Sequence, residues 1–232
     1  IAQQSDDKIV IGGYSIGANF SDFALLRFNP NGSLDTTFDT DGKILTRIGN
    51  FNDIIYGIAI QNDGKIIAAG VTDAGTTNNN YNNFAIVRYN SNGSLDTTFA
   101  TNGIASIDFA LNNDTAKSVV IQNDNKIIVA GASYYPNSID DFALLRLNSN
   151  GTIDTTFGTN GKTSTIIGNA TSEIANTILL QNDGKIILTG FSYSFTTNNY
   201  VFATARYNND IDLGTNTSEM PRFTAAIAPN PF

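Results

Sequence analysis

The hydrophobic residues of this chain lie in short runs that are separated by turn residues. In one stretch the runs cover residues 56–61, 65–72, 84–90 and 103–109, and the tight-turn sequences Asn-Asp-Gly and Asn-Gly lie between them. The second and third runs are almost continuously apolar, which is typical of strands in a sheet that is covered on both faces. No segment combines helical periodicity with capping residues. The pattern therefore predicts an all-β protein made of short antiparallel strands.

Three sequence motifs recur in the same order about every 60 residues. They are "QNDGKII", "DFALLR" and "GSLDTTF", each with variants. One repeat holds four predicted strands with two buried sheet faces, which is typical of a β-propeller blade. A β-solenoid or a chain of β-sandwiches is the alternative, but solenoid repeats are shorter and a sandwich needs about seven strands. We predict β-propeller blades over residues 1–213, with three, four, four and three strands, as part of a larger ring.

The repeated motifs resemble the delta-60 repeat of secreted bacterial proteins. The resemblance covers about residues 1–213 and rests on the three motifs recurring together and in order. It implies a β-propeller fold and an extracellular protein. It implies no particular reaction.

Residues 214–232 differ in composition from the repeats and form a second region. Residues 214–218 are a polar linker, and the final "APNPF" resembles the start of the C-terminal sorting domain of type IX secretion cargo. A proline-rich tail without a sorting role is the alternative. Because delta-60 repeats and such a tail occur together in Bacteroidetes-like cargo, the resemblance implies a secreted or cell-surface protein with the type IX secretion machinery as a partner.

Charge and composition limit the chemistry of the chain. It has 13 Lys and Arg against 21 Asp and Glu, a net charge of -8. This balance disfavours nucleic acid and anionic membranes as partners, because both carry phosphate groups. No apolar run approaches the roughly 20 residues of a membrane span, so we expect no membrane insertion. The chain has no His and no Cys, which removes the usual general base, the catalytic thiol and nearly all zinc sites. We expect no cofactor and no metal.

An arginine and an acidic residue recur once per repeat. The arginine lies four residues after the Phe of "DFALLR", and the acidic residue lies eight residues before the repeated Gln. Because arginine and a carboxylate form planar two-bond pairs, we predict a ladder of structural ion pairs, one per blade. A ring of arginines that binds a ligand is the alternative. The predicted ladder consists of Arg27, Arg88, Arg146, Arg206, Asp53, Asp114 and Glu173.

The triplet Asp-Thr-Thr is a further repeated feature, and its Asp is expected to cap a turn. The nearby "DTDG" at residues 39–42 is similar to calcium loops, but its equivalents "ATNG" and "GTNG" lack both carboxylates. Asp-Thr followed by Thr or Ala also resembles an O-glycosylation signal of the same bacterial group. The predicted acceptors are Thr36, Thr97, Thr115 and Thr155.

The loops between the second and third strands vary from repeat to repeat and are expected on one rim of the ring. They hold most of the aromatic residues that we expect to be exposed. Loops on a rigid scaffold often carry function, and Tyr with Asn suits sugar or protein recognition. Ordinary loop variation is the alternative. The candidate ligand-binding rim consists of Tyr81, Tyr134, Tyr135, Tyr193, Phe195 and Tyr200.

These features predict a binding or adhesion-type module without catalysis, whose partner is a protein or glycan at the cell surface. The alternative is a propeller enzyme, a glycoside hydrolase or lyase, that acts on polysaccharide with Asp140 and Asp141 as its paired acids. Asp141, however, fills a position that every repeat contains, whereas a catalytic residue is expected only once. A third interpretation is cargo or bulk in a surface assembly, without a small ligand.

Overall fold

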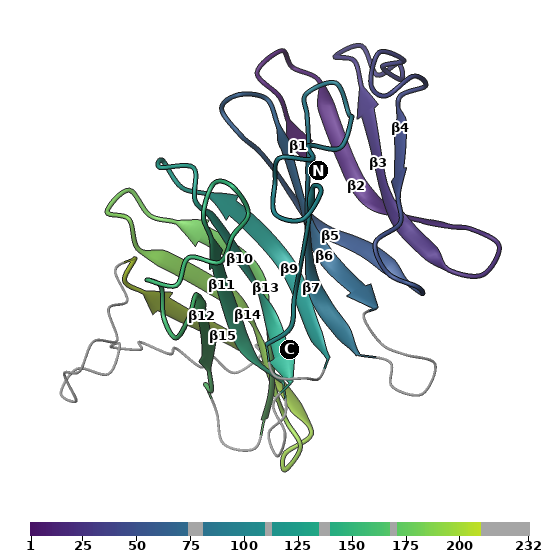
Figure 1. Ribbon diagram of the computed structural model, residues 1–232. Coiled ribbons are helices and arrows are strands. Elements are labelled where there is room, and N and C mark those ends of the chain that lie inside the picture. Colours follow the sequence, from purple (N-terminus) through teal and green to yellow (C-terminus); the bar gives the residue numbers. More distant parts are fainter. Residues whose placement is uncertain (74–80, 110–112, 135–139, 168–170, 210–232) are drawn as a thin grey trace.

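The computed structural model describes residues 1–73, 81–109, 113–134, 140–167 and 171–209. Within these residues the chain forms four sheets, and every pair of neighbouring strands is antiparallel (Figure 1). Each sheet is a simple meander, in which the strands lie in chain order. No helix in this part of the chain is long and apolar enough to cross a membrane.

The four sheets correspond to the four predicted repeats. The first sheet consists of β1 (Ala2–Gln3), β2 (Ile9–Ile16), β3 (Ser21–Phe28) and β4 (Lys43–Thr46). The second consists of β5 (Asp53–Ile60), β6 (Ile66–Asp73), β7 (Asn82–Tyr89) and β8 (Ile104–Ile107). The third consists of β9 (Asp114–Ile121), β10 (Ile127–Tyr134), β11 (Asp140–Leu147) and β12 (Lys162–Thr165). The fourth consists of β13 (Thr171–Leu180), β14 (Ile186–Ser194) and β15 (Asn199–Tyr207).

The prediction of an all-β protein with propeller blades is confirmed, and one strand count was wrong. The first sheet has four strands instead of three, because Ala2 and Gln3 pair with Val10 and Ile9 to form a two-residue strand. The region predicted as residues 214–232 lies outside the described residues.

The sheets share an axis that is lined by the first strand of each sheet. β1 contacts β5, β5 contacts β9, and β9 contacts β13. Consecutive blades therefore meet at their first strands, as the blades of a propeller do.

The core lies between the sheets. Each sheet has a backward face toward the preceding sheet and a forward face toward the following one. On the second sheet, Ile66 faces backward and clusters with Phe23 of the first sheet, whereas Ile67 faces forward and clusters with Ile127 of the third. Because successive residues of a strand point to opposite faces, burial of both faces explains the unbroken apolar runs in the sequence.

A repeated glycine allows the second strand of a blade to approach the first. β9 carries a bulge opposite Gly131, and a Cβ atom added at Gly131 would lie 1.8 Å from the carbonyl oxygen of Thr115. The equivalent distance is 1.9 Å at Gly70 and 1.8 Å at Gly190. Any side chain at these three positions would collide with the backbone, so the repeat requires glycine.

Candidate functional site

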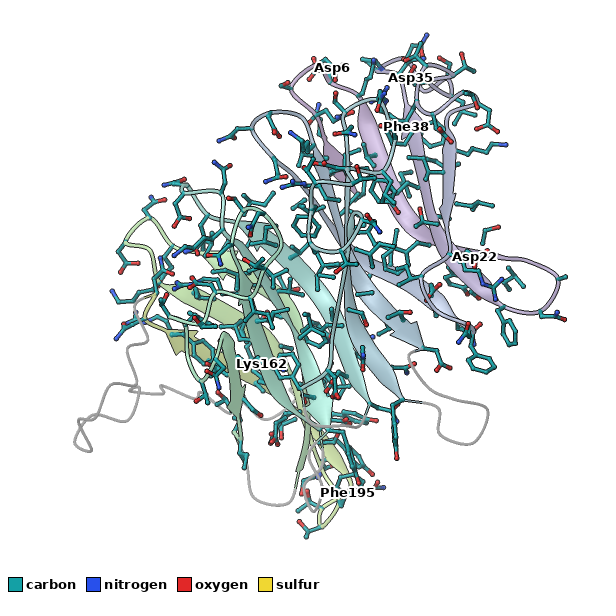
Figure 2. The ribbon with its side chains drawn as sticks, viewed as in Figure 1. Asp6, Asp22, Asp35, Phe38, Lys162 and Phe195 are labelled. Atoms are coloured by element: carbon teal, nitrogen blue, oxygen red, sulfur yellow. The ribbon has the colours of Figure 1, made fainter. Side chains whose placement is uncertain are left out.

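The strand directions give the propeller two different rims. The turn rim holds the tight turns after the first strands and the Asp-Thr-Thr segments after the third strands. The loop rim holds the loops between the second and third strands and the connections from one blade to the next. Figure 2 shows this separation on the first sheet, where Asp6 and Asp35 lie at one end and Asp22 lies at the other.

The loop rim carries an aromatic cluster on the β14–β15 hairpin. The ring of Tyr193 lies 4.6 Å from that of Tyr200 and 4.9 Å from that of Phe195, and the ring of Tyr200 lies 5.4 Å from that of Phe191. Tyr200 is 61% exposed and Phe195 is 56% exposed. Tyr193 and Tyr200 are cross-strand partners, and the hydroxyl of Tyr193 donates a hydrogen bond to Asn198. The rings are thus fixed on a paired hairpin, and those of Phe195 and Tyr200 face solvent.

The other predicted rim residues are spread over different blades. Tyr134 is exposed at the end of β10, and Tyr81 is half-buried just before β7. Tyr135 lies outside the described residues. Of the six predicted residues, the structure therefore brings together Tyr193, Phe195 and Tyr200.

A buried carboxylate supports the loop rim at the start of three first strands. Asp53 accepts hydrogen bonds from the backbone N–H groups of Ile48, at 2.7 Å, and Gly49, at 3.2 Å. Asp114 accepts one from Phe109 at 2.7 Å, and burial raises the pKa of Asp114 to about 6. The side chain of Glu173 accepts a hydrogen bond from the Ser192 hydroxyl. Asp53 and Asp114 therefore fix the chain that enters their blades.

The arginine ladder exists on the turn rim, but its acidic partners differ from the predicted ones. The Nε atoms of Arg27, Arg88 and Arg146 lie 2.7, 2.8 and 2.7 Å from an aspartate oxygen. The pairs are Arg27–Asp35, Arg88–Asp96 and Arg146–Asp154. The pairing with Asp53, Asp114 and Glu173 was wrong, because a first strand begins on the loop rim and a third strand ends on the turn rim. The constant spacing of eight residues from each arginine to the Asp of "DTT" was the sequence signal for the observed pairs.

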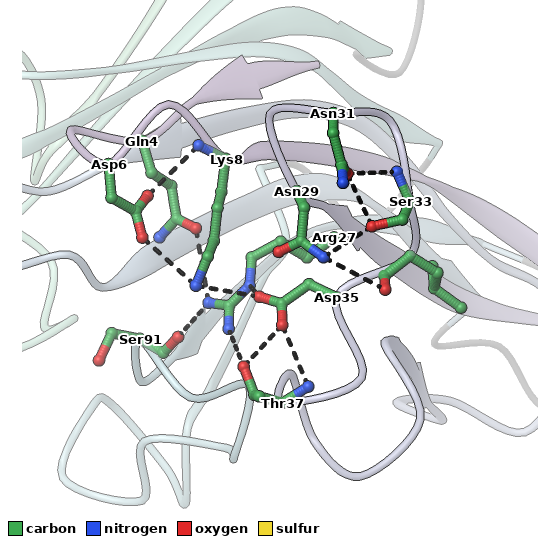
Figure 3. A network of polar contacts seen from close by, with 11 residues as sticks. Gln4, Asp6, Lys8, Arg27, Asn29, Asn31, Ser33, Asp35, Thr37 and Ser91 are labelled. Carbon is green, nitrogen blue, oxygen red and sulfur yellow. Dashed lines mark hydrogen bonds and ion pairs between the residues drawn. The ribbon is translucent and has the colours of Figure 1, made fainter.

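The aspartate of each pair is held by several donors. Asp35 also accepts hydrogen bonds from the hydroxyl and the backbone N–H of Thr37, and Lys8 lies 3.2 Å away (Figure 3). The Thr37 hydroxyl, together with Lys8 and Arg27, holds the pKa of Asp35 well below its ordinary value. The guanidinium of Arg27 also lies 4.4 Å from the ring centre of Phe38. Asp35 is therefore ionised at neutral pH.

Each paired arginine also binds the next blade. Arg27 Nη1 donates to the backbone carbonyl of Ser91 at 2.5 Å, and Arg88 Nη1 donates to that of Ser149 at 2.6 Å. Arg146 Nη1 donates to the carbonyl of Asn209 at 2.9 Å. The ladder therefore links consecutive blades, which sequence reasoning missed because a carbonyl acceptor carries no residue signature. Arg206, the fourth predicted member, is exposed.

The family model of a β-propeller domain of unknown function, DUF5122, matches four segments of the sequence, residues 4–38, 61–99, 122–157 and 181–210. These segments cover more than half of the chain. The chain belongs to the DUF5122 β-propeller family. The first three matched segments each run from the repeated Gln to the Phe that stacks on the ladder arginine, so the DUF5122 repeat includes the complete Arg–Asp pair.

Solved structures share the fold at low sequence identity. A protein of unknown function from Dyadobacter fermentans DSM 18053 is 11% identical with a TM-score of 0.57, and the match covers 90% of this chain and 64% of that one. MPT-4, a mannose phosphorylase from Leishmania mexicana, is 12% identical with a TM-score of 0.48, and the match covers 89% and 62%. The chain thus spans less than two thirds of the length of both neighbours. No curated protein matches the sequence.

The DUF5122 turn rim also forms a polar cleft between consecutive blades. Between the first and second sheets the cleft has a volume of about 600 Å³, and Lys8, Arg27, Gln61 and Ser91 are among the residues that line it. Equivalent clefts lie between the other sheets. Gln61 and Gln122 are buried, and their side-chain oxygens have no hydrogen-bond partner among the described residues. Amide and carbonyl groups dominate these clefts, which suits ordered water.

The predicted glycosylation acceptors occupy two different environments. Thr36, Thr97 and Thr155 are exposed on the turn rim, next to the ladder aspartates. Thr115 is half-buried within β9, where its backbone is paired with Ala132. An enzyme reaches the first three much more easily than the fourth.

The carboxylates considered for catalysis do not face each other. Asp140 and Asp141 are adjacent on β11, so their side chains point to opposite faces of the sheet. Asp140 accepts a hydrogen bond from the hydroxyl of Ser172, and Asp141 accepts one from that of Ser164. In "DTDG", Asp41 caps its turn by accepting the N–H of Lys43. Across the described ranges, no group of three or more acidic residues is placed to hold a metal.

Proposed function

We propose that this DUF5122 propeller is a non-catalytic binding module whose loop rim recognises a glycan or a protein at the cell surface. The observation that carries the proposal is the cluster of Tyr193, Phe195 and Tyr200 on the β14–β15 hairpin. Flat, exposed rings stack on the apolar faces of sugar rings or on protein side chains, and tyrosine hydroxyls add directional hydrogen bonds.

The hairpin is suited to binding because it is already ordered. Tyr193 and Tyr200 face each other across paired strands, and the neighbouring Asn198 is bonded to Tyr193. Little conformational entropy is lost when rings that are held in this way bind a ligand, so more of the contact energy remains as affinity.

The position of Tyr193 stays accessible in the third blade, which has neighbours on both sides. Tyr134 occupies in the third blade the position that Tyr193 occupies in the fourth, and it remains 39% exposed between two sheets. A ligand can therefore reach this position in the third blade, whereas the equivalent Asp73 of the second blade is buried.

Glycan-array binding with the purified full chain tests the proposal. We expect binding to a defined class of glycan that falls at least about tenfold in Tyr200→Ala, which removes the most exposed ring of the cluster. Tyr56→Ala is the matched control, because it removes an exposed tyrosine from β5, away from the hairpin, and it should bind like the wild type. A protein partner, captured from the host envelope by the same chain, should show the same dependence. Ligand binding that is equal in both variants would contradict the proposal.

The enzymatic alternative makes a different prediction. A glycoside hydrolase would release chromophore from one of a panel of chromogenic glycosides, and Asp140→Asn and Asp141→Asn would abolish the release. We expect no turnover, because the two carboxylates point to opposite faces of β11.

We also propose that the protein is secreted or displayed on the cell surface as type IX secretion cargo, and that Thr36, Thr97 and Thr155 carry O-glycans. The resemblance of the repeats and of "APNPF" to such cargo supports the first part, and the exposure of the three threonines supports the second. Mass spectrometry of the native protein in host culture fractions tests both. Protein retained inside the cell, or unmodified peptides, would contradict the corresponding part.

A further inference from the structure

The first strands of three blades carry a bulge at the same point of the repeat. In each bulge one residue of the first strand has no partner on the second strand; these residues are Tyr56 on β5, Lys117 on β9 and Asn176 on β13. A bulge turns a side chain out of the regular alternation of a sheet. Tyr56 and Asn176 are exposed, whereas the preceding residues, Ile55 and Ala175, belong to the packed clusters between the sheets. The bulge residues therefore lie outside the core, along the axis that the first strands line.

The bulge residues differ from blade to blade, although the strands that carry them repeat. Each of β5, β9 and β13 has a buried acid near its start and is followed by the repeated Gln. At the bulge, by contrast, the three blades place a phenol, an ammonium and a carboxamide. The packing of one blade on the next uses the repeated residues, so it does not account for these three.

The bulges of neighbouring blades are close together. The Nζ atom of Lys117 lies 3.6 Å from the ring centre of Tyr56. On the other side of β9, the hydroxyl of Ser118 accepts a hydrogen bond from the backbone N–H of Ile178 on β13, at 3.3 Å. Because β13 packs on β9 as β9 packs on β5, the repeat places Asn176 relative to Lys117 as it places Lys117 relative to Tyr56. The three side chains therefore form one group on the axis.

Lys117 is a half-buried cation without an anionic partner. Among the described residues no carboxylate lies within ion-pair distance of its ammonium, which rests on the ring of Tyr56. Burial lowers the pKa of Lys117, since no negative charge offsets its partial loss of water. The half-buried lysines that follow the tight turns each pair with an aspartate; these are Lys8, Lys65, Lys126 and Lys185. In a chain with a net charge of -8, the unpaired Lys117 marks a place for a bound anion.

The neighbouring bulge residues offer uncharged hydrogen-bond donors to the same anion. Within the described ranges, the hydroxyl of Tyr56 and the amide of Asn176 form no hydrogen bond. The ring of Tyr56 holds one side of the ammonium, which has three N–H groups, so others remain free for a ligand. A single ammonium balances a single negative charge, and the acidic chain disfavours a phosphate dianion.

We propose that the axis binds a small organic carboxylate, which pairs with Lys117 and accepts hydrogen bonds from Tyr56 and Asn176. Charge-assisted hydrogen bonds of this kind are the strongest that a neutral-pH site can offer. The axial site is separate from the loop-rim cluster, and its ligand is independent of the glycan or protein that binds there.

NMR titration of the isotopically labelled full chain with L-lactate, benzoate and D-glucuronate tests the proposal. We expect at least one of these carboxylates to bind with a Kd below about 10 mM and to shift the backbone signals of the three bulges. The neutral counterparts lactamide, benzamide and D-glucose should leave the bulge signals unchanged. Lys117→Met keeps the aliphatic chain without the charge and should raise the Kd at least about tenfold, whereas Lys117→Arg keeps the charge and should stay within about threefold of the wild type.

Tyr200→Ala is the control that separates the two sites. It removes a ring of the loop-rim cluster and should bind the carboxylate like the wild type, so the axial site and the loop rim can fail independently. Thermal unfolding checks that each variant is folded, and the comparison of carboxylates with neutral counterparts needs only the wild-type chain. The proposal is overturned if no carboxylate shifts the bulge signals, or if a neutral counterpart shifts them equally. Binding that persists in folded Lys117→Met, or inorganic phosphate that shifts the bulges where the carboxylates do not, also overturns it.

Discussion

The turn rim and the loop rim are built by the same strands, but they differ in which side chains recur from blade to blade. On the turn rim, three blades place an arginine, an aspartate, a threonine and a phenylalanine in the same geometry, and each arginine binds the next blade. On the loop rim, the buried acid at the start of the first strand recurs, but the exposed side chains differ from blade to blade. The repeated chemistry therefore holds blades together, whereas the single, non-repeated cluster at Tyr193 and Tyr200 is the better candidate for recognition.

The largest expected effect comes from breaking one ladder pair. Asp96→Ala leaves the buried guanidinium of Arg88 without its carboxylate, and it should lower the free energy of unfolding by about 3–5 kcal/mol. Urea denaturation at neutral pH measures the change.

The same repeat supplies the control for this prediction. Arg206→Ala removes the exposed member of the series and should alter the free energy of unfolding by no more than about 0.5 kcal/mol at a concentration where the chain is monomeric. Equal losses in the two variants would show that the ladder does not stabilise the turn rim.

The next largest effect is a difference between the two rims in how their carboxylates make the stability depend on pH. The pKa of Asp114, about 6 in the folded chain, lies above its ordinary value of 3.8. The folded state therefore binds this proton more tightly, so the contribution of Asp114 to stability is present below about pH 4 and is lost as the pH rises to about 6. The loss is on the order of 2–3 kcal/mol. Asp35, whose pKa is lowered, behaves in the opposite way, and its contribution is lost only as the pH falls below 3.8.

Urea denaturation between pH 4 and pH 7 tests the loop-rim part of this prediction. Asp114→Asn should remove most of the decline in stability over this range, because the amide does not ionise. If the stability of Asp114→Asn declines with pH as much as that of the wild type, groups other than Asp114 cause the decline.

A smaller effect is expected at the glycine that faces the bulge. Gly131→Ala forces the backbone of β9 and β10 apart and should lower the free energy of unfolding by about 2 kcal/mol, as overpacking does. Gly13→Ala is the control, since a Cβ at Gly13 meets no atom within 4 Å. Thermal unfolding compares the two variants, and a Gly131→Ala protein as stable as Gly13→Ala would contradict the close approach.

The smallest effect concerns a hydroxyl that joins two blades. The buried Tyr89 donates a hydrogen bond to the hydroxyl of Thr46 in the preceding blade at 2.7 Å. Tyr89→Phe should cost about 1 kcal/mol in the free energy of unfolding, the usual net worth of one such bond. Thr46→Val removes the acceptor of this bond. If Tyr89→Phe lowers the free energy of unfolding as much in the Thr46→Val background as in the wild type, the loss comes from packing and not from the hydrogen bond.

The sequence predicted the fold well because a period of about 60 residues and apolar runs of strand length are properties of the chain itself. It missed β1, since a two-residue strand has no pattern of its own. It also paired the ladder arginines with Asp53 and its equivalents. Strand direction places those acids on the other rim, whereas Asp35, Asp96 and Asp154 lie eight residues after each arginine.

The candidate site was predicted less completely. Exposed aromatic residues in variable loops indicated the loop rim, but the meeting of Tyr193, Phe195 and Tyr200 depends on the register of β14 and β15.

Hydrogen–deuterium exchange of the full chain, with and without a glycan identified on the array, shows which rim binds the ligand. If recognition belongs to the loop rim, the ligand should slow exchange in residues 191–201 and leave the turn-rim segment 88–99 unchanged. Protection confined to the ladder and its clefts would contradict the account, because the repeated turn rim would then be the binding surface.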